Sequence, residues 1–142
     1  NERIVSASLY NLEARLAKQL AQENYGIWND LSQSLLVRML DDDHFFCNEY
    51  LLFRATRSWI RYNQERQTEQ VLSDVLATIR YPILTPEELY EVERDEIVQQ
   101  SPTASSLVQN ALRYKLFKSC PRARHTENWE GKQYNPRKVK EI

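Results

Sequence analysis

Two histidines and two cysteines have the widest chemical range of any residues in this chain. His44 lies three positions before Cys47, and His125 lies five positions after Cys120. Together they supply two nitrogens and two sulfurs, a donor set found in structural zinc sites. A cysteine beside a histidine is also the core of a nucleophilic dyad, but no third group that would orient the histidine is evident here.

The separation of the two pairs argues against both kinds of site. Cys120 follows Cys47 by 73 positions and lies in a C-terminal segment with little hydrophobic pattern. We therefore expect no metal ligand and no catalytic pair among these four residues. Cys47 is instead expected to be a buried thiol beside a histidine at the surface.

The carboxylates that cluster in the sequence have simpler explanations than catalysis. The triplet Asp41–Asp43 lacks the central glycine and distal glutamate of a calcium loop, so we interpret it as a charged turn between helices. Another group falls early in a short predicted helix, where acidic side chains favour the positive helix end: Glu87, Glu88, Glu91 and Glu93. Nothing selects a pair for general acid–base work. We predict no catalytic residue, no metal ligand, no cofactor-binding residue and no cofactor.

The composition favours one helical domain. The chain has 142 residues, of which 42% are apolar and 27% charged, which is ordinary for a globular protein with a core. Only two residues are glycine, so tight hairpins and glycine-rich phosphate loops have little to be built from. No apolar run approaches the length of a membrane span, and no signal-peptide pattern precedes the first helix. With two cysteines and no glycosylation sequon, a cytoplasmic or nuclear setting fits best.

Apolar residues recur every three to four positions in six segments, the period of amphipathic helices. These segments start near Val5, Leu31, Leu51, Val71, Pro86 and Pro102. Short connections between them predict an antiparallel helical array. We expect residues 1–119 to form this domain, truncated at its N-terminal part because the chain begins at Asn1 without Met. Residues 120–142 are expected to be a basic, poorly structured tail or linker.

Several residues mark the ends of these helices. The run Tyr81-Pro82 should end the fourth helix, because a residue before proline avoids the α conformation. Thr85, Pro86 and Glu88 have the spacing of a capping box with proline at the first helical position. The other expected N-caps are Asp30, Asn48 and Ser101. Thr85 and Ser101 are thus interpreted as caps rather than nucleophiles. Trp59 and Tyr62 are expected in the core.

The net charge of −1 is unevenly distributed. From Arg113 onward there are nine basic and three acidic residues, a net of +6, and the preceding part carries ten basic and seventeen acidic residues, a net of −7. The favoured interpretation of the basic tail is a solvated linker to a following domain. The alternative is an anionic partner such as nucleic acid or a phospholipid headgroup. Trp129 and Tyr134 could stack on bases or pack the tail onto a neighbouring domain.

Four segments, in order, resemble the BACK domain of BTB-BACK (Kelch-like) proteins. The run from Asn48 to Asn63, N-E-Y-L-L-F-R-A-T-R-S-W-I-R-Y-N, is similar to the family's signature helix. The preceding L-L-V-R-M-L-D-D-D-H-F-F-C resembles its apolar helix and turn, with Asp41 and Asp42 in place of serines. I-R-Y-P-I-L-T-P-E-E-L and S-P-T-A-S-S-L-V-Q-N-A-L-R-Y-K-L-F resemble the later segments. The resemblance is good from Leu35 to Leu116 and weaker before Leu31.

This resemblance implies a function that the residues alone do not. BACK domains connect an N-terminal BTB domain to a C-terminal Kelch or other substrate-binding domain. In many such proteins, BTB and the first BACK helices bind cullin-3, and the protein is the substrate adaptor of a ubiquitin ligase, usually a BTB-mediated homodimer. We therefore expect a non-catalytic scaffold with protein partners and no membrane. The family's first helix lies upstream or is missing. Val5, Leu9 and Leu12 are the nearest candidates for cullin contact, although core packing explains them better.

Two other functions remain open from the sequence. One is a BTB-BACK interaction protein of structural, transcriptional or galectin-binding type without a ligase role. The other is a nucleic-acid- or anion-binding module that uses the tail after Leu116, which we regard as less favoured because no nucleic-acid motif is present. An enzyme is the least favoured class. The identity of a substrate would reside in a domain outside this sequence.

Overall fold

The regular structure of the described residues is entirely helical. The computed structural model describes residues 2–127 and 129–138, and for residues 2–8 it describes the backbone alone. Within these ranges there is no strand, which confirms the predicted all-α class. The α-helices are α1 (Glu2–Ala21), α2 (Gly26–Asn29), α3 (Gln33–Asp41), α4 (Glu49–Tyr62), α5 (Glu69–Leu76), α6 (Pro86–Arg94), α7 (Glu96–Gln99), α8 (Pro102–Phe117) and α9 (Pro121–Thr126). Short 3-10 helices are η1 (Gln64–Arg66), η2 (Tyr81–Ile83) and η3 (Lys132–Tyr134).

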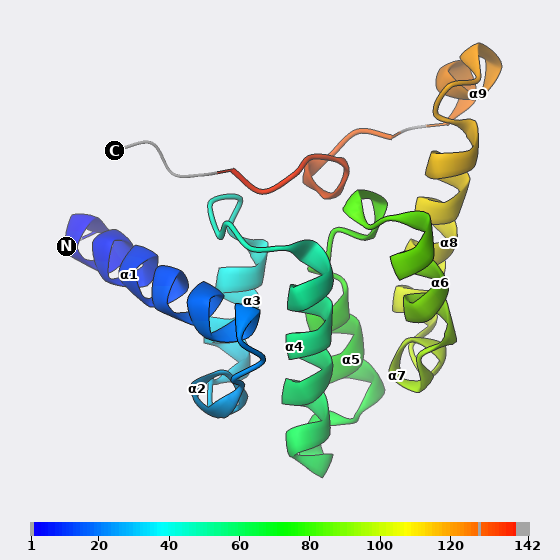
Figure 1. Ribbon diagram of the computed structural model, residues 1–142. Helices are drawn as coiled ribbons and strands as arrows, with labels where there is room; N and C mark the ends of the chain where they lie inside the picture. The colour runs from blue at the N-terminus through cyan, green and yellow to red at the C-terminus, as the bar shows by residue number, and fades with distance from the viewer. Residues whose placement is uncertain (1, 128, 139–142) are drawn as a thin grey trace.

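The longer helices form an antiparallel array, as predicted. Helices α3, α4 and α5 stand side by side and alternate in direction, with α1 and α2 on one side and α6, α7 and α8 on the other (Figure 1). Helix α4 contacts α1, α2 and α5, while α5 also contacts α3 and α8. The six predicted helices correspond to α1, α3, α4, α5, α6 and α8. The sequence missed α2, α7 and α9 because helices of four to six residues are too short to show a hydrophobic period.

One continuous apolar core joins these helices. Its largest fully buried side chains include Trp28, Trp59, Tyr81, Phe45 and Phe53. Trp59 lies on α4, is 1% exposed, and donates from Nε1 to the Leu31 carbonyl oxygen at 2.9 Å, so its one polar atom is satisfied. The prediction of Trp59 as a core residue is therefore confirmed.

The prediction for Tyr62 is wrong. This side chain, three positions after Trp59, is 61% exposed. Its position at the last residue of α4 places it beyond the point where α4 is covered by its neighbours. The Arg66 guanidinium lies 4.0 Å from the centroid of the Trp59 ring and 5.7 Å from the centroid of the Tyr62 ring. Arg66, and not Tyr62, therefore covers the indole of Trp59 at this end of α4.

Most of the predicted helix ends are confirmed. The side chains of Asn48 and Ser101 accept from backbone amides three residues on, and Thr85 and Glu88 form a complete capping box. Asp30 is the exception among the predicted N-caps: it follows α2 as its C-cap, and Ser32 caps α3 instead. The predicted end of the fourth helix at Tyr81-Pro82 is also wrong: α5 ends at Leu76, five residues before Tyr81, and a separate 3-10 turn surrounds Pro82.

The C-terminal segment differs from the expected poorly structured tail. It contains α9 and η3, and residues 132–138 cross back over the ends of α3 and α4 (Figure 1). The backbone amide of Lys138 donates to the Asp43 carbonyl oxygen at 2.7 Å. The physical reason is charge and ring packing: this segment brings basic and aromatic side chains that find partners on the acidic body.

Candidate functional site

The four residues with the widest chemical range do not meet in a reactive arrangement. His44, Cys120 and His125 are exposed, and Cys47 is half-buried near the start of α4. Burial raises the pKa of the Cys47 thiol to about 11, so at neutral pH it carries its proton and is a poor nucleophile. Over the described residues, no group of three or more His, Cys, Asp or Glu side chains is arranged to hold a metal ion.

The acidic residues 41–43 form polar contacts with the C-terminal segment and with Arg80. Lys132 Nζ lies 3.0 Å from Asp41 Oδ1 and 2.7 Å from the Asp41 carbonyl oxygen. The guanidinium of Arg80 donates to Asp43 Oδ1, and this hydrogen bond holds the pKa of the Asp43 carboxyl below its usual range. The triplet is therefore a charged turn, as the sequence indicates, and also a docking point that the sequence did not reveal.

A buried ion pair lies at the centre of this contact. Arg137 Nε donates to Glu49 Oε1 at 2.8 Å and Arg137 Nη2 to Glu49 Oε2 at 3.3 Å, a bidentate pair. Both side chains are almost inaccessible, with exposed fractions of 2% and 5%. Arg137 also donates to the carbonyl oxygens of Asp42 and Thr78, which brings its hydrogen bonds to four. A guanidinium with this many partners fixes its own position and that of the backbone that carries it.

Glu49 and Arg80 join this pair to the rest of the body. The Glu49 carboxylate also accepts from the Arg80 backbone amide at 3.0 Å. Arg80, only 2% exposed, donates from Nη1 to the carbonyl oxygen of Asn135 at 3.0 Å. We call this network the tail junction. It consists of Asp41, Asp43, Glu49 and Arg80 from the body and Lys132, Asn135 and Arg137 from the C-terminal segment.

Aromatic rings hold the same segment against α8. The Tyr114 ring centroid lies 5.5 Å from that of Trp129 and 5.0 Å from that of Tyr134, both edge-on. Partial burial raises the pKa of the Tyr134 hydroxyl. Trp129 and Tyr134 thus pack the segment onto its own domain.

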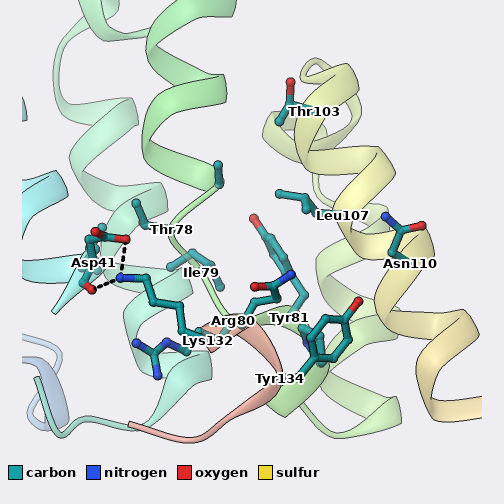
Figure 2. Close-up of a pocket in the computed structure, with 14 residues that line it drawn as sticks. Asp41, Thr78, Ile79, Arg80, Tyr81, Thr103, Leu107, Asn110, Lys132 and Tyr134 are labelled. Atoms are coloured by element: carbon teal, nitrogen blue, oxygen red, sulfur yellow. Dashed lines mark hydrogen bonds and ion pairs between the residues drawn. The ribbon is translucent and has the colours of Figure 1, made fainter. Parts of the chain in front are cut away.

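The body and the C-terminal segment together line a partly open cavity of about 320 Å³. Figure 2 shows Lys132 and Tyr134 on one side of it, with Thr103, Leu107 and Asn110 of α8 on another. The Lys132 ammonium turns away toward Asp41, and the Tyr81 hydroxyl donates to the Leu76 carbonyl oxygen. Both polar groups are thus engaged with the helical body rather than directed into the cavity.

The sequence analysis singled out the acidic triplet Asp41–Asp43 but none of the other residues of the tail junction. One feature of the sequence nevertheless indicated a contact between the two parts of the chain. The acidic body and the basic C-terminal part are of opposite sign, which favours contact between them. Glu49 was hidden because it directly follows the Asn48 cap, where an acidic residue is already explained by the helix dipole. Arg80 and Arg137 carry no local pattern that distinguishes them from surface arginines.

Comparison with known proteins gives a family match over most of the helical body. The sequence model described as "BACK: BTB And C-terminal Kelch" matches residues 8–94. That range includes the body side of the junction, from Asp41 to Arg80, and ends before α7. No solved structure matches significantly.

The similar curated proteins are much longer than this chain. Kelch-like protein 5 of Homo sapiens is 30% identical over 88 residues, which cover 61% of this chain and 12% of that protein. BTB/POZ domain-containing protein 17 of Xenopus laevis is 31% identical over 75 residues, 52% of this chain and 16% of that protein. Kelch-like protein 24a of Danio rerio is 29% identical over 92 residues, 63% of this chain and 15% of that protein.

Proposed function

The chain belongs to the BACK family (BTB And C-terminal Kelch), and from this premise we propose that it is a non-catalytic scaffold in a substrate adaptor of a cullin-3 ubiquitin ligase. In this role it links a BTB domain on its N-terminal side to a substrate-binding domain on its C-terminal side. BTB and the first BACK helices bind cullin-3, and the full-length protein is a BTB-mediated homodimer. Residues 120–142 are the connector to the following domain.

One observation supports the scaffold role above others: the Glu49–Arg137 pair. A linker that left the last helix freely would let the next domain take many orientations. Here the connector instead returns across the body and is held by a bidentate buried pair, just before the end of the described chain. A domain attached after Arg137 would therefore start from a fixed point on the helical body. A spacer that orients the domains on its two sides requires such a fixed attachment point.

The chemistry of the site supports the non-catalytic part of the proposal. Its charged groups are engaged with one another, and Cys47 is protonated at neutral pH. Within the described part of the chain, no helix is long and apolar enough to cross a membrane. We place the protein in the cytoplasm or nucleus, where ubiquitin ligases of this type act.

Helix α1 carries the nearest candidates for cullin contact: Val5, Leu9 and Leu12. Leu16 and Leu20 are buried in the core, and Leu9 and Leu12 pack against it, so core packing accounts for these side chains. The side chain of Val5 lies outside those described. We therefore assign cullin-3 contact chiefly to the upstream BTB domain and first BACK helix.

Affinity capture of the full-length protein tests the ligase assignment. Cullin-3 should be recovered with the wild-type protein and lost when the BTB domain is deleted, with a matched unrelated BTB-free bait as the control. If cullin-3 is recovered no better than with that bait, the ligase role is overturned. The BACK scaffold would then belong to an interaction protein of another kind.

The second candidate is a BTB-BACK interaction protein without a ligase role. It is favoured by the similarity to BTB/POZ domain-containing protein 17, whose name contains no Kelch.

Tail-mediated nucleic-acid binding receives less support. Lys132 and Arg137 are already paired with Asp41 and Glu49, so these two cations are engaged within the domain.

A further inference from the structure

A row of arginines lies along one face of α4, away from the tail junction. Arg54, Arg57 and Arg61 are spaced three and four residues apart, which places them on one side of a helix. With Tyr25, Tyr62, Asn29 and Ser58 they line a surface recess of about 380 Å³. The lining thus combines three guanidinium groups, two aromatic rings and two neutral polar side chains, without a carboxylate.

The three arginines are held with different strength. Arg57 is fixed by a 2.9 Å contact with Asp95, whose side chain is 5% exposed. Arg61 shares the same carboxylate at 3.8 Å and is itself 52% exposed. Arg54 pairs at 2.8 Å with Glu23, which is 55% exposed, and exposed pairs contribute little free energy. Arg54 and Arg61 can therefore turn to an incoming anion at small cost, while Arg57 stays in place between them.

We propose that this recess binds an acidic segment of a partner protein in the polyproline II conformation, with two carboxylates three residues apart. Arg54 and Arg61 are separated by seven residues, which is about 10.5 Å along a helix. In a polyproline II segment, which has three residues per turn and a rise of about 3.1 Å per residue, side chains at positions i and i+3 lie on the same face, about 9 Å apart. The two spacings are similar, so one carboxylate meets Arg54 and the other meets Arg61.

The aromatic side chains suit the same occupant. Tyr62 is 61% exposed, and the Arg66 guanidinium on its ring holds it in place beside Arg61. Tyr25, which is half-buried, also lines the recess. Exposed tyrosines give flat contact area at low entropic cost, as in other protein-binding surfaces. A nucleic acid fits less well, because its closely spaced phosphates require a longer basic track, and Glu23 and Asp95 border this one.

The proposal is independent of the cullin-3 assignment, which places cullin-3 contact chiefly in the upstream BTB domain and first BACK helix. It is tested with the complete 142-residue chain and a short fluorescein-labelled peptide centred on Glu-Ser-Thr-Glu, by fluorescence anisotropy at low salt. The double variant Arg54→Gln/Arg61→Gln should weaken binding at least about tenfold. The double variant Arg38→Gln/Arg94→Gln removes the same charge from other exposed positions and should bind like wild type. Thermal melting establishes that both variants fold.

Several results would overturn the proposal. One is absence of saturable binding to the wild-type chain, and another is equal affinity of the Arg54→Gln/Arg61→Gln variant. A peptide centred on Glu-Glu-Ser-Thr, with adjacent carboxylates, should bind less tightly, and equal binding would overturn the matched spacing. If a single-stranded oligonucleotide bound more tightly than the peptide through the same arginines, the occupant would be nucleic acid and not an acidic segment.

Discussion

Arg137 and Glu49 form a buried bidentate ion pair although they are 88 residues apart in the chain. Glu49 lies at the first residue of α4, and Arg137 lies in the segment that crosses the ends of α3 and α4. Because Glu49 also accepts from the Arg80 amide, one carboxylate ties together three segments distant in sequence. The C-terminal segment is therefore part of the folded unit, and its deletion should lower the free energy of unfolding of the helical body.

Removing one partner of this pair should be strongly destabilising. The change Arg137→Gln leaves Glu49 buried and charged without its counter-ion, which costs about 3–5 kcal/mol of unfolding free energy. Urea denaturation of the variant and of Arg122→Gln, at an exposed position of α9, supplies the measurement and its control. The double variant Glu49→Leu/Arg137→Met should recover much of the loss, because it leaves no isolated charge. A midpoint unchanged by Arg137→Gln would mean that the pair is not buried in solution.

Acidification should weaken the junction through Asp43. The pKa of this carboxyl is lowered by its hydrogen bond from Arg80, so the folded state holds a proton there less readily than the unfolded chain does. This contribution to stability is present above the unfolded pKa near 4 and is lost as the pH falls through the folded value. Asp43 is 48% exposed, so solvent screening keeps the effect below about 1 kcal/mol.

Hydrogen exchange of residues 132–138 as a function of pH measures this effect. Protection should fall as the solution is made acidic, and Asp43→Asn should already show reduced protection at neutral pH. Asp74→Asn, at an exposed position of α5, is a matched control on the body. Equal protection in Asp43→Asn and wild type would show that Asp43 does not hold the segment.

The helical body could be predicted largely from its sequence because its signals are local. The spacing of Leu16 and Leu20, the Asn48 cap and the Thr85–Glu88 capping box each depend on residues within one or two turns. The exposed position of Tyr62 could not be read this way. Its heptad-like spacing from core residues predicts burial, and only the end of the neighbouring packing at the C-terminus of α4 leaves it in solvent.

The tail junction could not be predicted for the opposite reason: each of its contacts joins positions far apart in the chain. Arg80 and Asn135 are 55 residues apart, and Lys132 and Asp41 are 91 apart. Charge asymmetry favours contact between the two parts but does not select which arginine enters the core. That selection depends on the carbonyl oxygens of Asp42 and Thr78, which converge only after the helices have packed.

Truncating Trp59 should create a large core cavity. We expect Trp59→Ala to lower the free energy of unfolding by about 3–5 kcal/mol, through lost packing and the lost hydrogen bond to Leu31. Tyr62→Ala, on the same helix but at an exposed position, should change it by less than about 1 kcal/mol. Chemical denaturation of both variants gives the comparison. A similar loss in the two would contradict the different burial of these side chains.

The capping box should make a smaller, separable contribution. Thr85→Ala removes the acceptor for the Glu88 amide and should cost about 1 kcal/mol. Thr85→Ser keeps that acceptor and should cost less. Glu88→Ala removes the reciprocal bond to the Thr85 amide, so the two alanine changes should be less than additive. Strict additivity in thermal denaturation would indicate that the two hydrogen bonds form independently.

The two cysteines should differ sharply in reactivity. Burial raises the pKa of Cys47 to about 11, so less than about 0.1% is thiolate at pH 7.5, whereas Cys120 is exposed. A thiol-reactive maleimide should therefore label Cys120 rapidly in the folded protein and Cys47 only in denaturant, with Cys120→Ser as the control that isolates Cys47.

The same raised pKa makes Cys47 a source of alkaline instability. The folded state retains the Cys47 proton where the unfolded chain has lost it, so stability is complete below the unfolded pKa near 8.5 and falls as the pH rises toward 11. The difference in unfolding free energy between wild type and Cys47→Ala, followed from pH 8 to 10, isolates this contribution from the tyrosines and lysines that titrate in the same range. A difference that stays constant over that range would mean that the Cys47 thiol is not desolvated by the fold.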